Sequence, residues 1–156
     1  MSRVLNLIFA GAVVVLLQWL FFGRLEIWGA YPDVVLLFLI WLAVRHGRVY
    51  GAVGGFLVGF ALDAIYGLWG IQMFVKTLMG FLVGFVANIR SEVMEKLILR
   101  AVEATFVTTL VHNAILVLFV MLQSGTGRGS LVWAICVGGT LYTTFVAFLL
   151  SVFRSR

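Results

Sequence analysis

Two ionisable side chains lie inside apolar stretches of this chain, where a charge is costly and is normally paired or functional. Asp63 lies four residues beyond Gly59, shortly before a glycine-containing turn, and Lys76 follows soon after that turn. In an antiparallel helical hairpin the depths of these two residues differ by only about 3 Å, because each residue adds about 1.5 Å to a helix. We therefore expect an ion pair between Asp63 and Lys76 near one membrane surface. The alternative is a proton or substrate site, although one acid and one base are few ionisable residues for such a site.

A stripe of polar side chains runs along a later apolar stretch, and it consists of Thr105, Thr108, Thr109 and His112, with Asn113 beside it. We expect this stripe to face the interior of a helix bundle, where hydrogen bonds between helices can satisfy it. A titrating switch at His112 is the functional alternative. Two histidines and one cysteine, far apart in the chain, do not have the spacing of metal ligands.

Motifs that would indicate an enzyme are missing from the sequence. It contains no hydrolase elbow, phosphate-binding loop, dinucleotide fingerprint or metal-binding HExxH pattern. The six acidic residues are not paired for general acid–base work. The sequence therefore predicts no enzymatic activity, no cofactor and no bound metal.

The composition is that of a membrane protein. Of 156 residues, 63% are hydrophobic and 11% are charged, whereas a soluble domain is roughly half apolar and about a quarter charged. We predict a single polytopic domain over residues 1–156, an all-α bundle of six transmembrane helices. The predicted spans cover residues 4–22, 31–44, 49–66, 70–89, 104–122 and 131–153.

The positive charges predict the orientation of these spans. The net charge of +5 comes from residues at the edges of apolar runs, so the positive-inside rule explains it better than nucleic-acid binding. With the N-terminus inside, eight basic residues lie on the cytoplasmic side, and only Arg24 and Arg128 lie outside. We therefore expect both termini in the cytoplasm. The outer ends carry Trp28, Tyr31 and Trp69, placed as interfacial anchors.

Two segments leave alternatives open. The stretch 31–44 is short for a crossing, so a re-entrant segment competes with a full span. Its opening residues, Tyr31-Pro32-Asp33, suit the first turn of a helix, because Pro is favoured at the first position and Asp by the helix dipole. Residues 90–103 have apolar and charged faces at helical spacing. They form either an interfacial helix on the cytoplasmic surface or an extension of the fifth span.

Glycines at four-residue spacing mark the third and fourth predicted spans: Gly51, Gly55 and Gly59 in one, Gly80 and Gly84 in the other. Small residues at this spacing allow helix backbones to approach closely in lipid. The two spans are joined by a tight turn, so the expected contact is with each other. Docking of a partner protein's transmembrane helix is the alternative.

An ordered set of these residues resembles the MreD family, the membrane component of the bacterial rod-shape machinery. The set covers residues 31–89 and consists of Pro32-Asp33, Arg45, Gly47, Gly51, Gly55-Phe56, Gly59, Asp63, Gly67 and Gly70. Lys76 is a departure from the pattern. The length and the layout of six spans also fit the family, and the later spans match it only in hydropathy.

The resemblance implies a scaffold in the bacterial inner membrane that binds MreC and helps to organise side-wall peptidoglycan synthesis. It implies a wider complex with MreB, RodA and a class B penicillin-binding transpeptidase. It also implies a fold similar to the substrate-binding subunits of energy-coupling-factor vitamin transporters. A small-molecule transport subunit is therefore the alternative function, and Thr108, His112 and Asn113 would line its cavity.

Overall fold

The chain folds almost entirely into helices. The computed structural model describes residues 2–68, 70–89, 98–124 and 129–154. In chain order the helices are α1 (Ser2–Leu20), the 3-10 helix η1 (Phe22–Arg24), α2 (Val34–His46), α3 (Arg48–Tyr66), α4 (Ile71–Ile89), α6 (Ile98–Ser124), α7 (Gly129–Trp133), the π-helix η2 (Ala134–Gly139) and α8 (Thr140–Arg154). The described ranges hold one isolated β-bridge, between Ile27 and Ala30, and no strand, so the predicted all-α class is confirmed.

The second helix begins later than the sequence predicts. Tyr31 and Pro32 were expected in or at its first turn, but α2 starts at Val34 and Asp33 is its N-cap. The Asp33 side chain accepts a hydrogen bond of 2.8 Å from the backbone N–H of Leu36. An aspartate at this position satisfies one of the free N–H groups of the first helical turn. The helix therefore starts one residue after the aspartate instead of two residues before it.

Glycines with positive φ connect the helices of the first half. Gly47 separates α2 from α3 with a φ of 87°, and Gly67 ends α3 in the left-handed conformation with a φ of 69°. Residues with a Cβ adopt these angles only at a cost, so glycine allows each reversal to be tight.

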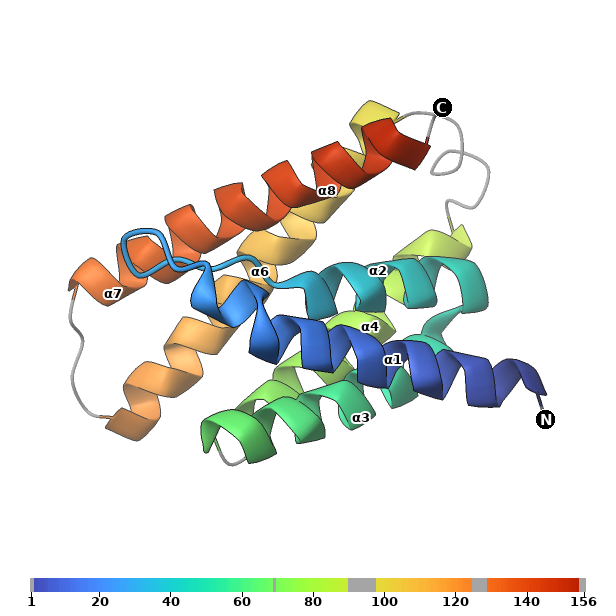
Figure 1. Cartoon of the computed structure of the whole chain (residues 1–156), viewed down its shortest axis with the longest axis horizontal. Coiled ribbons are helices and arrows are strands. Elements are labelled where there is room, and N and C mark those ends of the chain that lie inside the picture. Colours follow the sequence, from blue (N-terminus) through green and yellow to red (C-terminus); the bar gives the residue numbers. More distant parts are fainter. Residues whose placement is uncertain (1, 69, 90–97, 125–128, 155–156) are drawn as a thin grey trace.

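The helices form two groups that cross each other. α3 and α4 make a closely packed antiparallel hairpin, α2 packs against both, and α1 covers α2 and α3. α6 and α8 form a second hairpin that lies across this group, as Figure 1 shows, and α6 contacts α4. α1 begins and α8 ends at the same end of the molecule (Figure 1). That end also holds the connection between α2 and α3.

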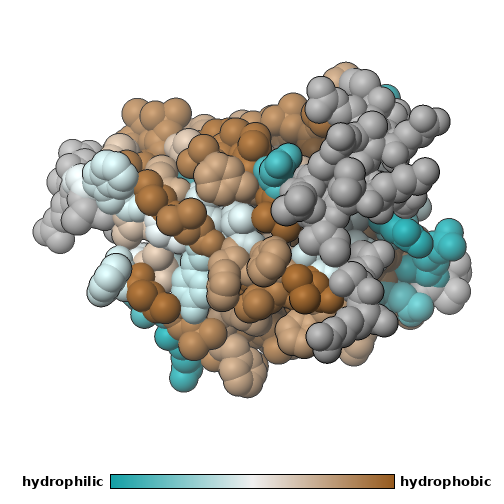
Figure 2. Space-filling view, turned by 90° about the horizontal axis from the view of Figure 1, so that it is seen from above, coloured by the Kyte–Doolittle hydropathy of each residue, from teal (hydrophilic) through white to brown (hydrophobic). Residues whose placement is uncertain are grey.

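Apolar side chains fill the interior and also cover the outside. Val15, Val35, Val58 and Leu62 form one buried cluster between α1, α2 and α3, and a second lies between α4 and α6. Large apolar side chains point outward all round the bundle, among them Phe9, Phe60 and Phe145, which are 70%, 60% and 57% exposed. Brown, hydrophobic residues accordingly dominate the described surface in Figure 2. A soluble protein rarely exposes so much contiguous apolar surface, so lipid is the solvent for it.

Within the described residues, four helical segments are long and apolar enough to cross a membrane: Arg3–Arg24, Arg48–Tyr66, Val102–Gln123 and Ala134–Phe153. Two shorter apolar helices, Val34–His46 and Ile71–Ala87, correspond to the second and fourth predicted spans. The segment 90–103 lies mostly outside the described residues. From Ile98 onward the chain already belongs to α6, as the extension alternative predicts for those positions.

Candidate functional site

A buried ion pair joins the start of α2 to α4. The Nζ atom of Lys76 lies 2.5 Å from the Oδ2 atom of Asp33, and the Lys76 side chain has no exposed surface. The two residues are 43 positions apart in the chain. A charge in the interior of a membrane protein is tolerated when it is paired, and the carboxylate of Asp33 supplies that pairing to Lys76.

Hydrogen bonds extend this pair into α6 and the last helical segment. The Nε2 atom of His112 lies 3.5 Å from the Lys76 ammonium, and its Nδ1 atom lies 3.1 Å from Asn113 Oδ1. The Asn113 amide donates to the carbonyl of Ile135 and to the hydroxyl of Thr140. Because an ammonium group can only donate, we assign the proton of His112 to Nδ1, which donates to Asn113.

The backbone before α2 is held by two further polar side chains. Gln18, on α1, donates from Nε2 to the carbonyl of Pro32 at 3.0 Å and accepts through Oε1 from the N–H of Val34 at 2.8 Å. The N–H of Asp33 donates to the Thr143 hydroxyl at 3.0 Å. Four helices therefore meet at residues 32–34. We call the joined set of Gln18, Asp33, Lys76, His112, Asn113, Thr140 and Thr143 the polar network.

Sequence reasoning missed Gln18, Thr140 and Thr143. Gln18 is buried although it lies in an otherwise apolar run. The signal that could have found it is a polar amide within a membrane-spanning stretch, which usually points to a hydrogen-bond partner inside the bundle. Thr140 and Thr143 are buried too, but threonines are common in membrane helices and nothing in their spacing marks them.

The expected ion pair between Asp63 and Lys76 is wrong. The Asp63 carboxylate instead accepts hydrogen bonds from the backbone N–H groups of Gln72 and Met73, at 3.0 and 2.9 Å. It therefore caps α4, whose first N–H groups have no partner within the helix. Gly55 of α3 packs directly on the Lys76 backbone, while the Lys76 ammonium pairs with Asp33.

The glycines of α3 and α4 contact each other's helix. A methyl group added to Gly51 would overlap the backbone of Gly80, and one added to Gly59 would lie 2.5 Å from the Cα atom of Met73. Gly84 faces the Cα atom of Arg48 in the same way. This row of glycines is therefore occupied by the protein's own hairpin, and docking of a partner helix on it is ruled out by the closeness of the two backbones.

The structure buries most of the polar stripe on α6. Thr105, Thr109, His112 and Asn113 are each 7% exposed or less, whereas Thr108 is only partly buried. His112 and Asn113 belong to the polar network, and Thr109 lies one turn before them. Thr108 lies four residues before His112, near the same face of α6, but it is less deeply buried.

The described residues contain no group of three His, Cys, Asp or Glu side chains placed to hold a metal ion. Cys136 is a free thiol on η2 and is partly buried. What the polar network does contain is a balanced set of donors and acceptors that connects the two groups of helices.

The family model described as rod shape-determining protein MreD matches residues 2–155 of the chain. The chain belongs to the MreD family. It is accordingly a rod shape-determining membrane protein, and the family is not a known enzyme family. No curated protein and no solved structure matches the chain. The expected likeness to the substrate-binding subunits of energy-coupling-factor transporters therefore has no support.

The residues that carry the MreD resemblance have structural tasks here. Asp33 caps α2 and pairs with Lys76, and Asp63 caps α4. Gly47 and Gly67 allow the two turns, and the glycines between them allow α3 and α4 to touch. Lys76, which is not one of the residues that carry the resemblance, lies at the centre of the polar network.

Proposed function

We propose that this MreD-family protein is a non-enzymatic scaffold of the bacterial elongation machinery, and that it binds MreC directly. The proposal extends to a wider complex with MreB, RodA and a class B penicillin-binding transpeptidase, within which the chain helps to organise side-wall peptidoglycan synthesis. The family membership carries the proposal. The absence of an enzyme motif in the sequence supports it.

The polar network also supports a structural role over transport. A transporter subunit would hold its substrate in a polar cavity near the middle of the membrane. His112 and Asn113 instead bond to each other and to neighbouring helices, and both are more than nine-tenths buried. These side chains stabilise the contact between α4, α6 and η2. The cavity that Asn113 lines in the described part of the chain has a volume of about 20 Å³, room for about one water molecule.

The test is complementation combined with co-purification. A rod-shaped bacterium depleted of its own MreD would express this chain together with tagged MreC from the same source. We expect rod shape to return and the two proteins to remain together in mild detergent. An unrelated single-span protein with the same tag serves as the control. Restored shape without retained MreC would contradict direct binding, and uptake of a vitamin by proteoliposomes would favour the transport alternative.

We further propose six spans in the inner membrane with both termini in the cytoplasm. The excess of basic residues on one side of the predicted spans supports this orientation, and so does the position of the first and last helix ends on one side of the molecule (Figure 1). Arg3→Cys and Arg24→Cys, each in a Cys136→Ser background, place a thiol at an exposed position. A membrane-impermeant maleimide should label only Arg24→Cys in spheroplasts and both after lysis, and the reverse pattern would invert the topology.

A further inference from the structure

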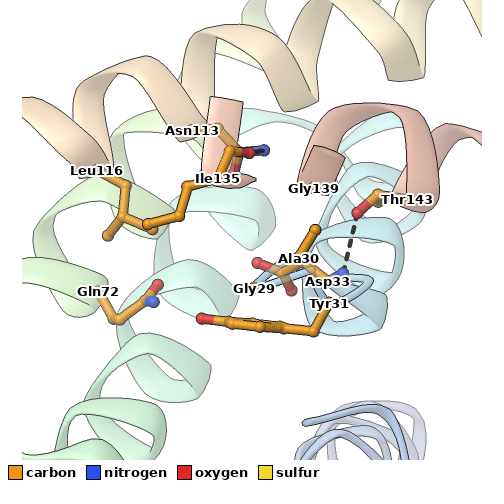
Figure 3. A pocket seen from close by; sticks show the side chains of 10 residues that line it. All are labelled: Gly29, Ala30, Tyr31, Asp33, Gln72, Asn113, Leu116, Ile135, Gly139 and Thr143. Carbon is orange, nitrogen blue, oxygen red and sulfur yellow. Dashed lines mark hydrogen bonds between the residues drawn. The ribbon is translucent and has the colours of Figure 1, made fainter. Parts of the chain in front are cut away.

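A small cavity lies where the two groups of helices meet. Its walls come from the segment before α2, from the start of α4, from α6, and from η2 and α8, and they include Tyr31, Asp33, Gln72, Asn113 and Thr143 (Figure 3). Its volume is about 20 Å³, and it is partly open to the surface. A cavity of this size holds about one water-sized group, so it can receive a single hydroxyl but not a whole small molecule.

One side chain in this wall has an unused hydrogen-bond acceptor. Gln72 is only 5% exposed, and its Oε1 atom has no hydrogen-bond partner among the described residues. Buried polar atoms of this kind are rarely left unpaired in proteins. In Figure 3 the Gln72 amide points from α4 toward Tyr31 and Asp33, across the space that the cavity occupies.

The charges around the cavity select a neutral ligand group. Asp33 is already paired with Lys76, so the wall carries no uncompensated negative charge that would attract a cation. Asn113 uses its amide nitrogen on Ile135 and Thr140 and its amide oxygen on His112. The Oε1 atom of Gln72 still needs a hydrogen-bond donor, and an uncharged hydroxyl group supplies one.

The surroundings point to a lipid as the carrier of that hydroxyl. Trp28 is next to the cavity-lining Gly29 and is 97% exposed. Aromatic side chains of this kind gather at the level of lipid headgroups. The cavity also lies toward the end of the bundle where α2 and α4 begin, which is the end that the charge pattern places outside. A lipid with a hydroxyl in its headgroup could leave its bulk in the bilayer and insert only that group.

We propose that this cavity binds a hydroxyl group of a polyol lipid headgroup, such as the glycerol of phosphatidylglycerol, through Gln72 Oε1. The bound lipid would bridge α4 to η2 and to the segment before α2, and so stabilise the contact between the two groups of helices. The lipid proposal does not depend on MreC binding, so it stands or falls independently of the proposed scaffold function. The same hydroxyl chemistry occurs in free glycerol, and the experiment must separate the two sources.

The test compares lipids of equal charge. The full chain, purified and stripped of lipid in detergent, is titrated with phosphatidylglycerol or with phosphatidylethanol, which has the same phosphate and no headgroup hydroxyl. Native mass spectrometry and thermal unfolding measure binding. One added neutral hydrogen bond predicts about fivefold tighter binding of phosphatidylglycerol. If glycerol at millimolar concentration abolishes that preference, the hydroxyl site is supported and its natural ligand is a free polyol.

Two variants localise the effect. Gln72→Met keeps the volume of the side chain and removes the acceptor, and it should abolish the preference for phosphatidylglycerol. Thr144→Val removes another buried oxygen without a partner in the described part of the chain, outside the cavity, and it should leave the preference intact. Equal binding of the two lipids by the unaltered protein overturns the proposal whether or not either variant folds. A preference that survives Gln72→Met overturns it too.

Discussion

The ammonium group of Lys76 and the carboxylate of Asp33 lie 2.5 Å apart in the interior of the bundle, although 43 positions separate them in the chain. The Asp33 carboxylate also caps α2 through its other oxygen. A single side chain therefore starts one helix and neutralises the charge of another. Asp33 pairs with Lys76, whereas Asp63 caps α4. The first two predictions test these separate roles.

Removing the charge of Lys76 should destabilise the protein strongly. Lys76→Met leaves the Asp33 carboxylate without its counter-charge, and breaking a buried pair in this way costs about 3 kcal/mol or more. Unfolding in mixed detergent measures the loss. The double variant Lys76→Met with Asp33→Asn should recover much of the stability, because asparagine still caps a helix and carries no charge. A double variant no more stable than the single one would contradict the pairing.

Removing the Asp63 carboxylate should have a smaller and independent effect. Asp63→Ala leaves the first N–H groups of α4 without a cap, which costs about 1 kcal/mol. Its effect should add to that of Lys76→Met within about 0.5 kcal/mol, as expected for residues that share no partner. A double-mutant cycle measures this additivity. A coupling energy well above that value would restore the ion pair that the sequence suggested.

The glycine contacts predict a folding defect in the chain itself. Gly55→Ala places a methyl group against the backbone of Lys76 and Thr77, and the required shift of two packed helices costs about 1–3 kcal/mol. Gly129→Ala is the matched control, because a methyl group there meets no atom within 4 Å. Thermal unfolding without any partner present should separate the two variants. Equal stability of both would show that α3 and α4 are not in backbone contact.

The attachment of α1 should depend on Gln18. Gln18→Leu leaves the carbonyl of Pro32 and the N–H of Val34 without their partner, and an unpaired buried group costs about 1–3 kcal/mol. Asn6→Leu, at an exposed position on the same helix, should change stability little. Hydrogen exchange at Val34 should accelerate in Gln18→Leu. Unchanged protection at that amide would contradict the role given to Gln18.

The sequence predicts the elements of this fold better than it predicts their contacts. Long apolar runs and glycine turns fixed the places of the helices, since lipid demands continuous helix and tight reversals need glycine. The contact between α3 and α4 followed from the spacing of Gly51, Gly55 and Gly59. The partner of Lys76 could not be predicted in this way. The simplest expectation was a pair between two helices that follow each other in the chain. Helices that are apolar on all sides give no sign of which neighbour each face meets.

Two details of the site were beyond sequence reasoning for a different reason. The π-helix η2 brings the carbonyl of Ile135 to the Asn113 amide, and no residue type marks such a widening of the helix in advance. Gln18 and Thr143 bond to the same short backbone segment only because α1 and α8 both reach the start of α2. Contacts of this kind depend on how whole helices cross, which local patterns do not specify.

The pair between Asp33 and Lys76 also has a consequence for the biosynthesis of the protein. A lone lysine inside a membrane helix raises the cost of insertion through the translocon, by roughly 3 kcal/mol at the helix centre and by less toward its ends. Asp33 is translated 43 residues earlier, so it is already part of the nascent chain when Lys76 is added. α4 would therefore enter the bilayer beside α2 and α3 as part of a three-helix unit, and would not be released into lipid alone.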